Sequence, residues 1–128
     1  MRLLLDTHTL LWFLLDNAKL SPTARDAIVT PDNEIKVSPA TYWEIAIKIG
    51  LGKYALPEPF EVFMERELRI NHFRVLPIEL SHTAILTTLP LHHRDPFDRL
   101  LVAQAMVEQI PLVSRDIALD AYPIQRLW

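Results

Sequence analysis

Short apolar runs alternate with longer stretches of helical periodicity along the whole chain. The runs are brief, are bounded by polar residues or prolines, and have the composition of strands buried on both faces of a sheet. They predict five strands, over residues 3–5, 35–37, 73–78, 110–113 and 124–128. The stretches between them predict six helices, over residues 7–15, 22–30, 39–49, 59–68, 81–89 and 96–108. This alternation predicts an α/β fold with a mainly parallel five-stranded sheet that helices cover on both faces.

The longest of these helices carries acidic residues at the entrance to an apolar stretch. Asp95 followed by Pro96 is a helix start, because Asp accepts a bond from a free backbone N–H and proline lacks the N–H that would go unpaired. Between residues 100 and 107 only Gln104 is polar, which predicts a buried helix. Asp98 falls in its first turn. One interpretation is that Asp98 only stabilises the helix N-terminus, by about 0.3–1 kcal/mol.

Three other carboxylates fall where a parallel sheet would gather them. Asp6 ends the first predicted strand, Asp116 follows the fourth, and Glu44 lies on the helix after the second. Ligands bind outside the carboxyl ends of parallel strands, where the strand order reverses. If the first strand lies beside the fourth, Asp6, Asp116, Asp98 and Glu44 share one cleft. The competing interpretations are that Asp6 is only a helix cap and that Glu44 is a solvated helix residue.

Composition narrows the class of protein. The 128 residues are 50% hydrophobic and 23% charged, which indicates a single globular domain. A net charge of −3 argues against nucleic-acid binding through bulk positive charge, so any such contact needs a local patch. The absence of cysteine excludes disulfides and thiolate zinc sites and fits a reducing compartment such as the cytoplasm. The apolar N-terminus is interrupted by Asp6, His8 and Asp16, and no run reaches the roughly 18 apolar residues of a membrane span.

Carboxylates packed together repel one another unless a cation compensates them. All-oxygen ligand sets suit hard divalent ions such as Mg²⁺ or Mn²⁺. Such ions hydrolyse phosphodiesters by activating water and stabilising the leaving oxygen, with no need for a serine or cysteine nucleophile. The predicted acid cluster therefore favours metal-dependent phosphodiester hydrolysis.

Four segments together resemble the motifs of PIN-domain ribonucleases, and most of all those of VapC-type toxins from type II toxin–antitoxin systems. They are residues 3–9, 38–45, 95–105 and 114–116. The resemblance covers essentially the whole chain and implies one PIN domain over residues 1–128, with a three-layer α/β/α sandwich. It also implies a Mg²⁺- or Mn²⁺-dependent endoribonuclease, a homodimer, and a cognate antitoxin that blocks the acidic site. Carried over by residue, the metal-binding and catalytic acids are Asp6, Glu44, Asp98 and Asp116, with hydroxyl support from Thr7 and Ser114.

Other functions stay open or are disfavoured by particular residues. A haloacid-dehalogenase-type phosphatase would have a second Asp two residues after Asp6, where this chain has His8. A receiver domain would have a phosphorylatable Asp after its third strand, where this chain has Glu79. A non-catalytic binding module, and a PIN nuclease of RNA processing outside a toxin–antitoxin pair, are not separated from the toxin by sequence.

Basic residues near the acids have several interpretations. His92 and His93 are adjacent at a helix entrance, a spacing that rarely converges on one ion, so a zinc site is not expected. Arg94, Arg99 and Arg115 could bind RNA phosphates or balance the carboxylates. The segment 48–56 has two lysines and two glycines without phosphate-loop spacing, and we expect an ordinary connection there.

Overall fold

The computed structural model describes all 128 residues and contains one five-stranded sheet. The strands are β1 (Arg2–Leu5), β2 (Glu34–Val37), β3 (Arg74–Val75), β4 (Leu112–Val113) and β5 (Arg126–Leu127). All neighbouring strands are parallel, in the order β3-β2-β1-β4-β5. The predicted five-stranded α/β fold is therefore confirmed, and the sheet is parallel throughout.

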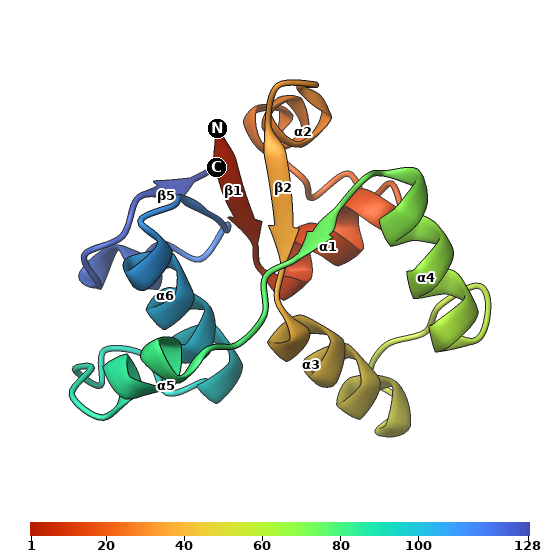
Figure 1. The fold of residues 1–128 in the computed structure, drawn as a ribbon. Helices are drawn as coiled ribbons and strands as arrows, with labels where there is room; N and C mark the ends of the chain where they lie inside the picture. Colours follow the sequence, from red (N-terminus) through yellow and green to blue (C-terminus); the bar gives the residue numbers. More distant parts are fainter.

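Helices cover the sheet on both faces (Figure 1). They are α1 (Thr7–Leu14), α2 (Pro22–Val29), α3 (Pro39–Gly50), α4 (Phe60–Ile70), α5 (Leu80–Leu86) and α6 (Pro96–Glu108), with a 3₁₀ helix, η1 (Ile117–Ala121). In Figure 1, α5 and α6 lie on one side of β1, and α1 and α4 lie on the other. The domain is therefore a three-layer α/β/α sandwich.

The alternation of side chains along β1 joins the central strand to both cores. Leu3 and Leu5 belong to the cluster that contains residues of α1, α2 and α4, whereas Leu4 belongs to the cluster that contains residues of α6, β4 and η1. All three leucines are fully buried, as expected for a strand whose side chains point alternately to the two faces. The apolar run of residues 3–5, which predicted a strand buried on both faces, is therefore confirmed as β1.

The strand order reverses beside β1. The chain passes from β1 to β2 and β3 on one side and then returns to place β4 on the other side of β1. Leu5 at the end of β1 pairs with Val113 at the end of β4. The predicted neighbourhood of the first and fourth strands is confirmed, and the segments that follow β1 and β4 emerge side by side.

Several element boundaries differ from the sequence prediction for identifiable reasons. The third strand is confined to Arg74–Val75, because beyond the bond from Leu76 N–H to the Val37 carbonyl the chain meets Pro77, which has no N–H to donate. Helix α5 starts after Glu79, not at Ser81, with the backbone N–H of Glu79 donating to His82 Nδ1 at 2.9 Å. The sequence pattern over residues 117–121 did not predict η1.

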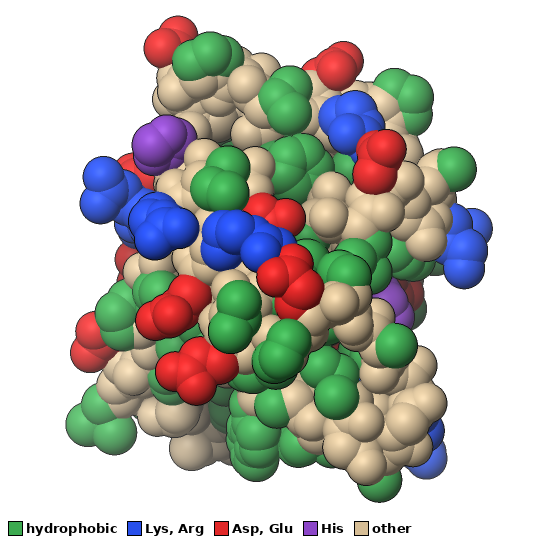
Figure 2. Space-filling model, turned by 90° about the vertical axis from the view of Figure 1, so that its right-hand side faces the viewer, with side chains coloured by type: hydrophobic (Ala, Val, Ile, Leu, Met, Phe, Trp, Pro, Cys, Tyr) green, Lys and Arg blue, Asp and Glu red, His purple; other side chains and the backbone are tan.

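The surface that carries α4 is mixed in character. Figure 2 shows acidic and basic side chains interspersed with hydrophobic ones on this face. The Glu58 carboxylate, for example, pairs with the Arg66 guanidinium. Exposed apolar side chains on α3 include Trp43 and Ile47. None of the helices is both long and apolar enough to span a membrane.

Candidate active site

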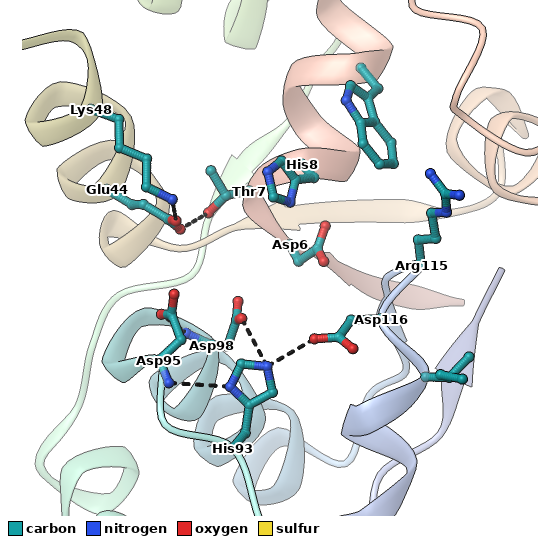
Figure 3. Close-up of a pocket in the computed structure, with 12 residues that line it drawn as sticks. Asp6, Thr7, His8, Glu44, Lys48, His93, Asp95, Asp98, Arg115 and Asp116 are labelled. Atoms are coloured by element: carbon teal, nitrogen blue, oxygen red, sulfur yellow. Dashed lines mark hydrogen bonds and ion pairs between the residues drawn. The ribbon is translucent and has the colours of Figure 1, made fainter. Parts of the chain in front are cut away.

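A cavity of about 450 Å³ opens at the carboxyl edge of the sheet, where the strand order reverses. It receives side chains from the segments after β1 and β4, from α3 and from the start of α6 (Figure 3). Its lining is mostly polar and consists of Asp6, Thr7, His8, Trp12, Glu44, Lys48, His93, Asp95, Asp98, Arg115, Asp116 and Ile117. The four acids singled out in the sequence all line this one cavity.

Asp6 is fixed by the start of α1. It is the N-cap of that helix, and its Oδ1 accepts a hydrogen bond from Thr9 N at 2.8 Å. The buried Ser114 hydroxyl also lowers the pKa of the Asp6 carboxyl group by favouring its charged form. Burial nevertheless raises the pKa of Asp6 above its ordinary value, outweighing these hydrogen bonds. The capping role and the position in the cavity are thus both realised by the same side chain.

Asp95 and Asp98 have different positions and contacts at the start of α6. Asp95 Oδ1 accepts from the N–H groups of Phe97 and Asp98, at 2.8 and 3.1 Å, which makes Asp95 the N-cap as the Asp-Pro pair predicts. Asp98 receives no such bond from the helix and projects into the cavity. Burial and the neighbouring carboxylates of Asp95 and Asp6 raise the pKa of Asp98 to about 7.

Asp116 closes the opposite wall. Its Oδ1 accepts from Ala118 N at 3.0 Å and caps η1, while its backbone N–H donates to Ser114 Oγ at 3.1 Å. Ser114 is fully buried directly after β4 and contacts both Asp6 and Asp116. Its hydroxyl therefore links the acids that follow the two central strands.

Glu44 is not the solvated helix residue that its place outside the apolar stripe suggested. Its side chain is 4% exposed. Glu44 Oε1 accepts from Thr7 Oγ1 at 2.6 Å, and Oε2 pairs with Lys48 Nζ at 2.6 Å. A buried carboxylate needs such partners, because an uncompensated charge in the protein interior is costly. The solvated interpretation is wrong, since α3 packs this face against the start of α1.

His93 is the site residue that sequence reasoning missed. Its Nε2 lies 2.8 Å from Asp116 Oδ2 and 3.4 Å from Asp98 Oδ2, so it bridges two acids (Figure 3). His92, its neighbour, packs edge-on against Tyr122 instead. The spacing of His92 and His93 predicted that the two side chains would not converge on one point, and they point to different partners. The local sequence does not show which of the two histidines faces the acids, because this depends on the position of Asp116 after β4.

The arginines near the acids have different roles from one another. Arg99 is turned away from the carboxylates and donates to the backbone carbonyls of Leu89 and Pro90, at 3.2 and 3.0 Å. Neither interpretation offered for Arg99 therefore holds. Arg115 is exposed, lines the cavity and lies 5.9 Å from the centre of the Trp12 ring. Arg94 is exposed and is not part of the lining.

The donor set of the cavity fits a divalent cation better than an uncompensated cluster. Asp6, Asp98 and Asp116 present carboxylate oxygens to a common space, and Lys48 is committed to Glu44. The nearest ligand atoms of His93, Asp98 and Asp116 all lie within 4.8 Å of one another. The raised pKa values of Asp6 and Asp98 show that burial and nearby acids disfavour negative charge here. Hard oxygen donors in such a field are typical of Mg²⁺ or Mn²⁺ sites.

The sequence and the fold both have known counterparts. A family model described as the PIN domain matches residues 3–124. The chain is 29% identical to "Ribonuclease VapC22" of Mycobacterium tuberculosis (strain ATCC 25618 / H37Rv) over 120 residues, which cover 93% of this chain and 90% of that protein.

Two solved structures share the fold at low sequence identity. VapBC2 from Rickettsia felis, crystallised with a DNA fragment from its promoter, aligns with a TM-score of 0.73 and 16% identity, covering 98% of this chain and 97% of that one. VapBC-1 from nontypeable Haemophilus influenzae aligns with a TM-score of 0.62 and 20% identity, covering 98% and 96%. At these identities the alignments establish the common architecture.

Proposed function

The chain belongs to the PIN domain family, and from this premise we propose that it is a metal-dependent endoribonuclease, the toxin of a toxin–antitoxin pair. The observation that carries the proposal is the convergence of Asp6, Asp98 and Asp116 in one cavity at the reversal of strand order. The similarity to "Ribonuclease VapC22" supports the same substrate class. A cavity lined by five acidic residues, in a chain without cysteine, suits metal-assisted hydrolysis of phosphodiesters.

The residues that would hold Mg²⁺ or Mn²⁺ are Asp6, Glu44, Asp98 and Asp116. When bound, the metal supplies a water of lowered pKa and Lewis-acid stabilisation of the phosphate oxygens. The protein contributes a pre-positioned set of oxygen donors, because Asp6 directly follows β1, Asp98 lies in the first turn of α6, and Asp116 caps η1 shortly after β4. Pre-positioned charge costs no reorganisation during the reaction.

Hydroxyl groups hold these acids in place. Thr7 donates to Glu44, and Ser114 accepts from the backbone of Asp116 while its hydroxyl favours the charged form of Asp6 and lowers its pKa. Both Thr7 and Ser114 are buried, so their bonds are not exchanged freely with water. We assign them the supporting role that the family resemblance implies: they fix which carboxylate oxygens face the cavity.

The RNA would enter along the wall that carries the positive charge. The charge is that of Arg115, which lines the cavity beside Trp12, and the Trp12 ring stacks on His8 at 5.4 Å between ring centroids. A guanidinium binds phosphate in a bidentate manner, and aromatic rings accept nucleobases without strong sequence preference. RNA binding at this wall would need only a local positive charge and no broad basic surface, which agrees with a net charge of −3.

The partners follow from the same cavity. A cognate antitoxin would inhibit the enzyme by placing a basic segment in the acidic cleft, and an Arg suits paired carboxylates better than a Lys. The similarity to the solved VapBC2 and VapBC-1 structures supports a partner of this kind. Exposed Trp43 and Ile47 on α3 offer apolar surface for the homodimer that the resemblance implies. An RNA substrate and an antitoxin partner would both be consistent with a protein that acts in the cytoplasm.

Cleavage of RNA by the purified protein tests the proposal. Incubation with a mixed-sequence RNA in Mg²⁺ or Mn²⁺ should give products with 5′-phosphate and 3′-hydroxyl ends, and excess EDTA should stop the reaction. Asp6→Asn, prepared identically, controls for contaminating nucleases and should be inactive. Cleavage that continues undiminished in EDTA would overturn the metal requirement. No cleavage under any condition would favour a non-catalytic binding module.

A further inference from the structure

The loop before α6 is fastened at several points, although only one of its side chains bridges the acids across the cavity. The buried hydroxyl of Tyr122 accepts the backbone N–H groups of His92 and His93, at 3.1 and 3.0 Å, and donates to the Pro90 carbonyl at 2.8 Å. Arg99 Nη1 donates to the Pro90 carbonyl and to Tyr122 Oη, at 3.0 and 3.2 Å. These bonds fix the backbone that carries His93.

The hydrogen bonds of His93 also favour one tautomer of its imidazole ring. The backbone N–H of Asp95 points to His93 Nδ1 at 3.2 Å, so Nδ1 acts as the acceptor. In a neutral imidazole the hydrogen then resides on Nε2. Nε2 is hydrogen-bonded to Asp116 Oδ2 at 2.8 Å, and Asp98 Oδ2 lies 3.4 Å from the same nitrogen. His93 is thus oriented as a donor toward Asp116, with the Asp98 carboxylate beside the same ring nitrogen.

This arrangement disfavours His93 as a metal ligand. A neutral histidine that coordinates through Nε2 carries its hydrogen on Nδ1, where it would oppose the N–H of Asp95. A donor to ligating carboxylates keeps the observed tautomer and leaves oxygen lone pairs on Asp98 and Asp116 free for an ion. We propose that His93 is a positioning residue of the active site: through Nε2–H it holds the Asp116 carboxylate, next to that of Asp98, in the orientation that binds the divalent metal, without binding the metal itself.

The inference rests on the proposed metal site and adds to it a residue outside the four acids. Loss of a group that orients metal ligands typically weakens metal binding by about 10–100-fold. His93→Ala should therefore weaken Mn²⁺ binding by that factor. His93→Gln, whose amide can donate from a similar reach, should stay near the wild-type affinity. His92→Ala is the matched control, since His92 contacts Tyr122 and none of the acids, and it should leave the affinity unchanged.

Mn²⁺ titration by calorimetry, followed by electron spin echo envelope modulation of the bound Mn²⁺, tests the proposal without using activity. The expected result is the affinity order given above together with no modulation from a directly coordinated imidazole nitrogen in the wild type. A directly coordinated nitrogen that disappears in His93→Ala would make His93 a ligand and overturn the inference. An unchanged Mn²⁺ affinity in His93→Ala, or a His93→Gln affinity as weak as that of His93→Ala, would also overturn it.

The variants separate this inference from the proposed function. If the wild-type protein binds no Mn²⁺ at all, the metal site itself is wrong. If the wild type binds Mn²⁺ and cleaves RNA while all histidine variants behave alike, only the role of His93 fails. Should His93→Ala not fold, His93→Gln and the spectrum of the wild-type protein still decide between a donor and a ligand.

Discussion

The hydroxyl of Thr7 donates to the carboxylate of Glu44 over 2.6 Å, across 37 residues of sequence. This bond joins the first residue of α1 to the middle of α3 inside the cavity wall, and both side chains are buried. Lys48 takes the other oxygen of Glu44 at 2.6 Å. The position of Glu44 therefore depends on a residue next to Asp6, which couples two of the proposed metal-binding segments.

Replacing this hydroxyl should lower both stability and activity. Thr7→Val keeps the size of the side chain and removes the donor, and hydrogen bonds to charged groups are worth about 1.5–3 kcal/mol. We expect a loss of stability in this range by chemical denaturation, and reduced RNA cleavage at saturating metal. Thr7→Ser retains the hydroxyl and serves as the control. Equal stability and activity in Thr7→Val and Thr7→Ser would show that the bond does not position Glu44.

The two aspartates at the start of α6 should separate into a structural and a functional residue. Asp98→Asn preserves shape and removes charge from a crowded cavity, so RNA cleavage should fall by orders of magnitude while the melting temperature does not decrease. Asp95→Asn still caps the helix and should keep most activity, whereas loss of the cap in Asp95→Ala should cost ~0.5–2 kcal/mol. Cleavage rates and melting curves of the three variants decide the matter. Near wild-type cleavage by Asp98→Asn would reduce Asp98 to a helix-stabilising residue.

The raised pKa of Asp98 predicts how stability depends on pH in the metal-free protein. The pKa rises from an ordinary 3.8 to about 7 in the folded state. A group of this kind contributes stability that is fully present below its unfolded pKa and is lost as the pH rises through the folded pKa. The melting temperature of Asp98→Asn should therefore match the wild type near pH 4 and exceed it by a growing margin up to pH 7. A margin that shrinks over this range would contradict the assignment.

Metal binding should stabilise the fold because it compensates acids that the sheet brings together. A ligand that binds only the folded state adds RT ln(1 + [L]/Kd), about 2.7 kcal/mol at a hundredfold excess over Kd. Melting curves at increasing Mn²⁺ should shift upward, and the shift should be largely lost in Asp116→Asn. Lys36→Gln, on β2 away from the cavity, is a control whose shift should equal that of the wild type. An unchanged wild-type melting temperature would count against a folded metal site.

Arg115 should contribute to RNA binding rather than to the chemical step. Its exposed guanidinium lines the cavity next to Trp12, where a phosphate of the RNA could be held. Arg115→Gln should raise KM, lower the salt dependence of binding by about one phosphate contact, and change kcat little. Arg94→Gln is the matched control, because Arg94 is exposed but outside the cavity lining. Equal effects of the two substitutions would indicate a non-specific loss of charge.

The amino-acid sequence by itself determined the order and type of the main elements. The apolar run of β1 and the apolar residues of α6 could be predicted from the local hydrophobic pattern. The Ser-Pro and Asp-Pro helix starts could be predicted from the capping preferences of these residues. The prediction that Asp95 caps α6 was correct because capping involves backbone groups only two and three residues away. Short-range interactions of this kind are written into adjacent residues.

Tertiary structure decided which side chains meet. The reversal of strand order beside β1 brings Asp6 close to Asp116, and the packing of α3 against α1 buries Glu44, which the helical pattern alone had placed in solvent. His93 reaches Asp116 across 23 residues, and Arg99 turns to loop carbonyls because the chain there folds back on itself. These contacts depend on the relative placement of whole elements, and local residue patterns do not encode it.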